Sequence, residues 1–221
     1  MATSSTPSRS DATASLPPPQ QQQPTQHLQP TQPQRRRRWA LWLLALAGWR
    51  TAYTQPPGPK GVIMVYPHTS NWDFVVGVLY KLGHRLPARF LGKDSLFRGL
   101  MGLIMRALGG IAIDRSRHHG VIAALLAEYE RRESMWLAIA PEGTRSWVPH
   151  LKSGFYHLCV EGRLPCALGF IDYGTKTVGI ERYVYFTGDV EKDLQMLREY
   201  YAAKRGRRQE LAGAIQFKDA R

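Results

Sequence analysis

Cysteine is scarce in this sequence, which has only Cys159 and Cys166 among its 221 residues. Two thiols this close together do not make the disulfide framework of a small secreted domain, and they fit a reduced, cytosolic setting better. No further His or Cys stands at a zinc-ligand spacing from His68, the histidine considered below. We therefore expect no metal site, and no cofactor.

Acidic residues are also few, with 17 Asp and Glu against 30 Lys and Arg, which gives a net charge of +13. The first fifty residues account for +5 of this, so the remaining +8 belongs to the rest of the chain. Such an excess attracts nucleic acid, anionic membranes or anionic small substrates. The arginines do not cluster in any recognised nucleic-acid module, so we do not expect nucleic acid as a partner.

Long apolar runs are missing as well. The longest, Trp39 to Trp49, covers about half of a bilayer core at about 1.5 Å per residue, so it cannot span a membrane unaided. Three interpretations apply: a signal peptide, a core helix, or an interfacial helix with its three Trp at headgroup depth and arginines 35–38 facing anionic lipid. Some thirty polar residues precede the run, and no convincing cleavage site follows it. We favour the interfacial helix, and predict a peripheral protein on the cytoplasmic face of a membrane.

Composition divides the chain into four parts. Residues 1–34 are rich in Ser, Thr, Pro and Gln and are predicted to be disordered. Residues 35–55 form the basic and apolar membrane-interface segment, residues 56–206 the folded domain, and residues 207–221 a C-terminal tail.

Strand and helix patterns alternate within the folded domain, which predicts a single α/β domain with a mixed, largely parallel sheet flanked by helices. Apolar and β-branched runs predict strands at 62–66, 88–95, 110–115, 135–143 and 164–173, with hairpin-like strands within 176–188. Amphipathic patterns predict helices at 71–83, 96–109, 118–134, 154–162 and 189–205.

Polar residues follow three of the predicted strands, at 68–73, 114–116 and 141–146. Loops after the carboxyl ends of parallel strands gather at one edge of the sheet, so we expect these three loops to meet there.

The first loop, "HTSNWD", holds His68 and Asp73 five positions apart. In a continuous helix these side chains would point about 140° apart. They can approach only if His68 lies in the turn and Asp73 in the first helical turn. The pair is then either a general base with its orienting carboxylate, a metal site, or a helix-start Asp beside an ordinary histidine.

The third loop, "PEGTRS", places Glu142, Gly143, Thr144 and Arg145 directly after a buried strand. Its backbone N–H groups and guanidinium suit a bound phosphate, although a simple turn with a solvated Arg would show the same letters. Arg115, in the second loop, is a second candidate cation.

Taken together, "HTSNWD", "GGIAIDRS", "PEGTRS" and "LPCALGF" follow in the order and approximate spacing of the four sequence blocks of the glycerolipid acyltransferase family. This family includes the 1-acylglycerol-3-phosphate acyltransferases, and the resemblance covers roughly residues 60–175. It implies the family's α/β fold, and an acyl thioester of coenzyme A or acyl carrier protein as co-substrate. It also implies transfer of the acyl group to a hydroxyl of a phosphate-bearing lipid.

The resemblance also implies roles for individual residues. His68 would deprotonate the acceptor hydroxyl, and Asp73 would hold the imidazole. The positions implied for substrate binding are Gly110, Arg115, Glu142, Gly143, Thr144 and Arg145 for the acceptor, and Pro165 for the acyl chain or thioester.

The sequence leaves two features of the reaction undecided. Residues 96–109 either line an apolar channel for the acyl chain or form ordinary core, and the oxyanion donors are either backbone N–H groups near Gly143 or a water. Other functions also remain: hydrolysis of a thioester or ester at the same site, or non-enzymatic binding of lipid or nucleic acid.

Overall fold

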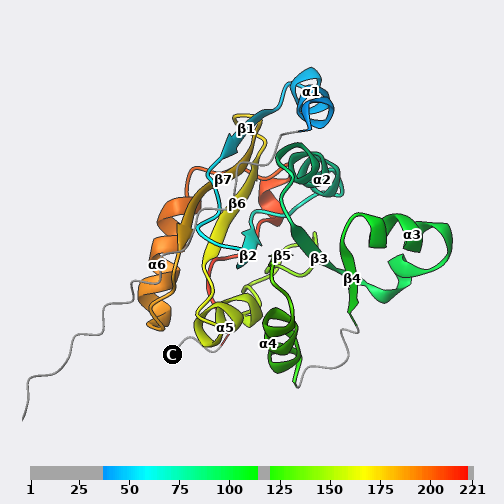
Figure 1. The fold of residues 1–221 in the computed structure, drawn as a ribbon. Coiled ribbons are helices and arrows are strands. Elements are labelled where there is room, and N and C mark those ends of the chain that lie inside the picture. Colours follow the sequence, from blue (N-terminus) through cyan, green and yellow to red (C-terminus); the bar gives the residue numbers. More distant parts are fainter. Residues whose placement is uncertain (1–36, 114–119, 219–221) are drawn as a thin grey trace, which may run out of the picture.

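In the computed structural model, which describes residues 37–113 and 120–218, seven strands form one sheet (Figure 1). The strands are β1 (Arg50–Tyr53), β2 (Lys60–Val65), β3 (Ala88–Lys93), β4 (Gly110–Ile113), β5 (Met135–Ile139), β6 (Cys166–Asp172) and β7 (Thr177–Val184). They lie in the order β1-β7-β6-β2-β5-β3-β4.

The sheet is mixed and largely parallel, as predicted. Strands β6, β2, β5, β3 and β4 are parallel to one another, β7 is antiparallel to β6, and β1 is parallel to β7. The hairpin-like pair expected within 176–188 is wrong, because this stretch forms the single strand β7. Strand β7 pairs in antiparallel orientation with the preceding strand, β6.

Helices cover both faces of the sheet. They are α1 (Arg38–Leu46), α2 (Trp72–His84), α3 (Gly99–Ala107), α4 (Val121–Arg131), α5 (Gly154–Glu161) and α6 (Val190–Tyr201), with short 3₁₀ turns η1 (Asp94–Phe97) and η2 (Gln209–Leu211). In Figure 1, α4, α5 and α6 lie on one side of the sheet and α1 and α2 on the other, while α3 stands beside the edge strand β4.

Side chains alternate between the two layers along the central strands. On β2, Val62 and Met64 are buried in the core with α4, α5 and α6, whereas Ile63 is buried in the core with α1 and α2. A strand with both faces covered must be apolar at every position, which is why "VIMV" and "CALGFI" read as continuous apolar runs. Each fully buried side chain of this size contributes about 1.5–3 kcal/mol.

The segment at 35–55 is part of this domain. Strand β1 pairs with β7, and α1 packs on α2 through the buried Ala40 and Leu44. Trp39 and Trp42 are exposed, but Trp49 is buried, so the expectation that all three Trp face a membrane is wrong for Trp49. Among the described residues, no helix has both the length and the apolar character needed to cross a bilayer.

The predicted C-terminal tail is folded as far as it is described. Residues 207–218 run along the loops that follow β2 and β5, where Phe217 forms a β-bridge with Leu151. The Tyr66 hydroxyl donates a 2.7 Å hydrogen bond to the Gly213 carbonyl. Residues 207–218 therefore belong to the folded domain, which the sequence pattern predicted to end at residue 206.

Candidate active site

Two of the three predicted loops meet at the carboxyl edge of the sheet. Strands β2 and β5 are parallel neighbours, so the loops that follow them lie side by side. The His68 N–H donates a 2.7 Å hydrogen bond to Oε2 of Glu142, which ties one loop to the other. The third loop, with Arg115, lies outside the described residues.

His68 and Asp73 do approach each other, because His68 precedes α2 and Asp73 lies in its first turn. Nδ1 of the imidazole is 3.3 Å from Oδ2 of Asp73, and the two side chains are 18% and 1% exposed. Catalytic hydrogen bonds are often this long in the absence of substrate. With Nδ1 facing the carboxylate, Nε2 is the nitrogen left for substrate.

Asp73 is held as a carboxylate. Its Oδ2 accepts the N–H groups of Thr69 and Ser70 at 2.8 and 2.9 Å. Burial alone would raise the pKa of Asp73, but the donors from His68, Tyr173 and Ser70 outweigh it and hold the pKa below its usual value. Because the folded pKa is depressed, the stability this group contributes is present above its unfolded pKa. It is lost as pH falls through the lower folded value.

Tyr173 is the fourth donor to this carboxylate, and sequence reasoning missed it. It lies in the turn between β6 and β7, and its hydroxyl donates a 2.8 Å hydrogen bond to Oδ1 of Asp73. Burial and the adjacent carboxylate raise the pKa of Tyr173, so the phenol stays protonated and remains a donor. The only signal in the sequence is a Tyr at the end of a buried strand.

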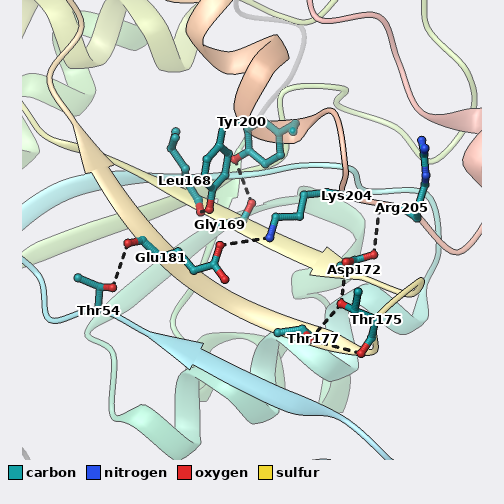
Figure 2. Close-up of polar contacts among 11 residues, drawn as sticks. Thr54, Leu168, Gly169, Asp172, Thr175, Thr177, Glu181, Tyr200, Lys204 and Arg205 are labelled. Atoms are coloured by element: carbon teal, nitrogen blue, oxygen red, sulfur yellow. Dashed lines mark hydrogen bonds and ion pairs between the residues drawn. The ribbon is translucent and has the colours of Figure 1, made fainter.

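A polar network fixes the turn that carries Tyr173. Asp172 accepts the Thr175 hydroxyl and the Arg205 N–H, as Figure 2 shows. Asp172 also accepts the Gly174 N–H. Burial would raise the pKa of Asp172, but these hydrogen bonds outweigh it, and the pKa is lowered. Because Tyr173 N–H also donates to the Arg205 carbonyl, the turn and the chain after α6 are held together.

The chain after α6 brings two further arginines to the site. The Arg208 N–H donates to Oγ1 of Thr69, and the Arg207 guanidinium lies 5.8 Å from the centre of the Trp72 ring. Arg207 was not among the predicted site residues, because it lies in a stretch that looked like a tail.

Glu142 connects two segments of the chain at this edge of the sheet. It is buried, and its two oxygens accept the N–H groups of His68 and Gly213 at 2.7 and 3.0 Å. Burial raises the pKa of Glu142 despite these two donors. Glu142 therefore joins the His68 loop to the C-terminal segment, and its contact with the acceptor stays a prediction.

The rest of the "EGTR" loop divides into structural and exposed positions. Gly143 has φ +67°, and a Cβ there would lie 2.9 Å from Cε of Lys152. Its N–H donates to the Ala140 carbonyl, so it is engaged and not a ready oxyanion donor. Oγ1 of Thr144 accepts a backbone N–H within the loop, and Arg145 is exposed to solvent.

Two predicted site residues lie elsewhere. Gly110 begins the edge strand β4, where a Cβ would lie 2.9 Å from the rings of Phe90 and Phe97, so close packing requires glycine. Pro165 precedes β6, and its carbonyl accepts the Val62 N–H near the start of β2. His68 is six positions further along the chain than Val62, which is roughly 20 Å of extended chain. The structure therefore does not bring Gly110 or Pro165 to the His68 loop, and the substrate contacts implied for them stay predictions.

An apolar cavity of about 200 Å³ lies between α2 and the sheet, and His68 and Asp73 are among the residues that line it. Small residues leave this space open: Gly77 on α2, and Ala88 and Ala138 on the strands beneath it. None of residues 96–109, which the sequence left as either channel or core, lines this cavity.

The described residues hold no group of three or more His, Cys, Asp or Glu side chains placed to bind a metal ion. Of the interpretations of His68 and Asp73, the geometry fits a base oriented by a carboxylate best.

The site thus belongs to an α/β domain with a His–Asp pair at the carboxyl edge of its sheet, beside an apolar cavity. Residues 51–167, more than half of the chain, match the acyltransferase family, and the chain belongs to that family. Its fold is similar to the crystal structure of the 1-acyl-sn-glycerophosphate (LPA) acyltransferase PlsC from Thermotoga maritima. The TM-score is 0.52 at 15% identity, over 74% of this chain and 73% of that one. No curated protein matches the chain.

Replacing Tyr173 by Phe removes one donor from the Asp73 carboxylate. We expect kcat to fall about tenfold with little change in KM, since a hydrogen bond to a charged group contributes about 1.5–3 kcal/mol and the phenol is only part-buried. Losing the donor raises the pKa of Asp73, so the acid limb of the kcat profile should move to higher pH.

Tyr183→Phe is the matched control, because it removes a 2.9 Å hydrogen bond to the Thr54 carbonyl away from the site. If both variants lose stability but neither shifts the pH profile, Tyr173 only supports the fold.

Proposed function

We propose that the protein transfers a fatty acyl group from an acyl thioester, of coenzyme A or acyl carrier protein, to a hydroxyl of a phosphate-bearing lysolipid such as 1-acylglycerol-3-phosphate. The observation that carries this proposal is the His68–Asp73 pair on the wall of an apolar cavity. Membership of the acyltransferase family and the PlsC-like fold support it.

In the proposed reaction, Nε2 of His68 takes the proton of the acceptor hydroxyl as its oxygen attacks the thioester carbonyl. The tetrahedral intermediate collapses, the C–S bond breaks, and the thiolate leaves with the proton that His68 returns. The product is an oxygen ester and a free thiol. Asp73 keeps Nδ1 oriented and stabilises the imidazolium between these steps.

The cavity is the proposed site of the acyl chain. It extends from His68 along α2 to the side chains of Leu86 and Ala88, between apolar walls. A chain inserted there would hold its thioester carbonyl beside His68. Gly77 is the position at which the helix lets the chain pass, because a Cβ there would have only Cδ1 of Ile171 within reach, at 4.0 Å.

Gly77→Leu should therefore shorten the chains that the protein accepts. We expect kcat/KM for long-chain donors to fall at least about tenfold while short-chain donors keep their rate, since a few methylenes excluded from the cavity cost about 0.8 kcal/mol each. Gly77→Ala is the control, because the cavity has room for one methyl group. A uniform loss with every chain length would place the acyl group elsewhere.

The acceptor phosphate is proposed to bind at the basic rim of the site. Arg145 is exposed in the loop after β5, Lys152 packs against Gly143 in the same loop, and Arg207 lies over Trp72. Guanidinium groups bind phosphate through two parallel hydrogen bonds. Arg115 remains a proposed contributor from the family resemblance.

Arg145→Ala tests the acceptor site. We expect KM for 1-acylglycerol-3-phosphate to rise about tenfold or more while KM for the donor changes little, since a lost charge-assisted hydrogen bond costs about 1.5–3 kcal/mol. Arg163→Ala, at the opposite edge of the sheet, should change neither. Equal effects on donor and acceptor would count against phosphate binding by Arg145.

The proposed partner surface is the anionic cytoplasmic face of a membrane, where the lipid acceptor resides. The exposed Trp39 and Trp42 of α1, beside the basic Arg37 and Arg38, support this placement.

A further inference from the structure

Helix α3 presents most of its apolar side chains to solvent. Gly102 and Met105 face the protein, and a Cβ at Gly102 would lie 2.2 Å from the Phe97 carbonyl oxygen, so the helix is seated closely on η1. The outward face consists of Leu100 (75% exposed), Leu103 (64%), Met101 (52%) and Ile104 (45%). These four residues are therefore not buried in the core, and none of them lines the cavity beneath α2.

The rest of the chain has little that could cover this face. The parts outside the described residues, 1–36, 114–119 and 219–221, contain only three large apolar residues, Met1, Leu16 and Leu28. None of these adjoins another, so they make no apolar surface that matches α3. The occupant must therefore come from outside the chain.

The charges around the face select the kind of occupant. Arg98 and Arg106 flank the apolar residues, and only Asp94, which pairs with Arg98 at 3.3 Å, offsets them. A second copy of the chain would bring these like charges together. An anionic bilayer accepts both arginines at its headgroups while the apolar side chains enter the acyl boundary, as in interfacial helices.

The position of α3 in the fold agrees with contact with a bilayer. The connections β2–α2–β3 and β3–α3–β4 cross the sheet in the same direction, and right-handed crossovers then put α2 and α3 on the same face. Figure 1 shows α1 and α2 on one side of the sheet, α4, α5 and α6 opposite, and α3 beside the edge strand β4. The cavity lies between α2 and the sheet.

We propose that the outward face of α3, formed by Leu100, Met101, Leu103 and Ile104, is a membrane-contact surface for anionic bilayers, in addition to α1. The proposed membrane contact rests on the proposed function in one respect, namely that the acceptor is a lipid. Contact through both helices would hold the α2 face, and the cavity beneath it, against the source of that lipid.

The test is co-sedimentation of the full chain with vesicles of phosphatidylcholine and phosphatidylglycerol. The double variant Leu100→Gln with Leu103→Gln should lower the partition coefficient at least about tenfold, because two side chains lose their burial in the bilayer. Leu100→Met with Leu103→Met should keep it. Tyr185→Gln, an exposed aromatic position away from α3, is the control and should also keep it.

An unchanged partition coefficient in the Gln variant would overturn the proposal. The proposal would also be overturned if the Gln variant still bound vesicles but no longer self-associated in their absence. The outward face of α3 would then be a contact between two copies of the chain. Acyl transfer to a detergent-solubilised acceptor should be unaffected by the Gln substitutions. If the wild type shows no transfer in that assay, the proposed function fails, whatever the vesicles show.

Discussion

His68→Ala should lower kcat for acyl transfer by about a thousandfold or more. A side chain that acts first as general base and then as general acid contributes about 10²–10⁴-fold to the rate. The fold should survive, because the His68 side chain is part-exposed and its backbone N–H, which holds the loop to Glu142, is unchanged by the substitution. The measurement is kcat with a labelled thioester, together with thermal unfolding of the same preparation.

His157→Ala is the matched control, since His157 is exposed on α5, on the other face of the sheet. It should leave kcat as in the wild type. A His68→Ala variant with normal stability and near-normal turnover would remove the imidazole from the mechanism.

Glu142→Gln should give the second largest loss. The carboxylate accepts one N–H from the His68 loop and one from the C-terminal segment, and an amide can accept only one of them. We expect the free energy of unfolding to fall by about 1–3 kcal/mol because a buried donor is left without a partner. We also expect kcat to fall about a hundredfold, since a displacement of about 1 Å in a reacting group has that effect.

Asp193→Asn separates these two effects. Asp193 is also buried and also accepts several donors, among them the Tyr156 hydroxyl and the Thr187 N–H, but on the face of the sheet away from the His68 loop. It should lose a comparable amount of stability and keep its turnover. If Glu142→Gln behaved in the same way, Glu142 would support the fold without positioning His68.

The sequence pattern predicts those features of the structure that depend on residues close together in the chain. The apolar runs of β2 and β6 and the periodicity of α2 predict their elements, and the parallel arrangement then brings His68 and Glu142 to one edge. The approach of His68 to Asp73 was also predictable, because it depends only on where α2 begins.

Contacts between distant segments were not predictable in the same way. Tyr173 follows Asp73 by 100 positions, and nothing local shows that their side chains meet. The segment at 207–218 looked like a tail because its few apolar residues are scattered, yet backbone hydrogen bonds to the loops hold it. The direction of a strand decides which of its ends faces the His68 loop, so Pro165 and Gly110, at the starts of β6 and β4, lie away from that loop.

The most direct test of the account is to identify the product that the purified protein forms from a labelled long-chain acyl thioester and 1-acylglycerol-3-phosphate. We expect the label in diacylated glycerol phosphate, in amounts that require His68. Release of the label as free fatty acid, at a rate that the acceptor does not change, would show a hydrolase and contradict the account.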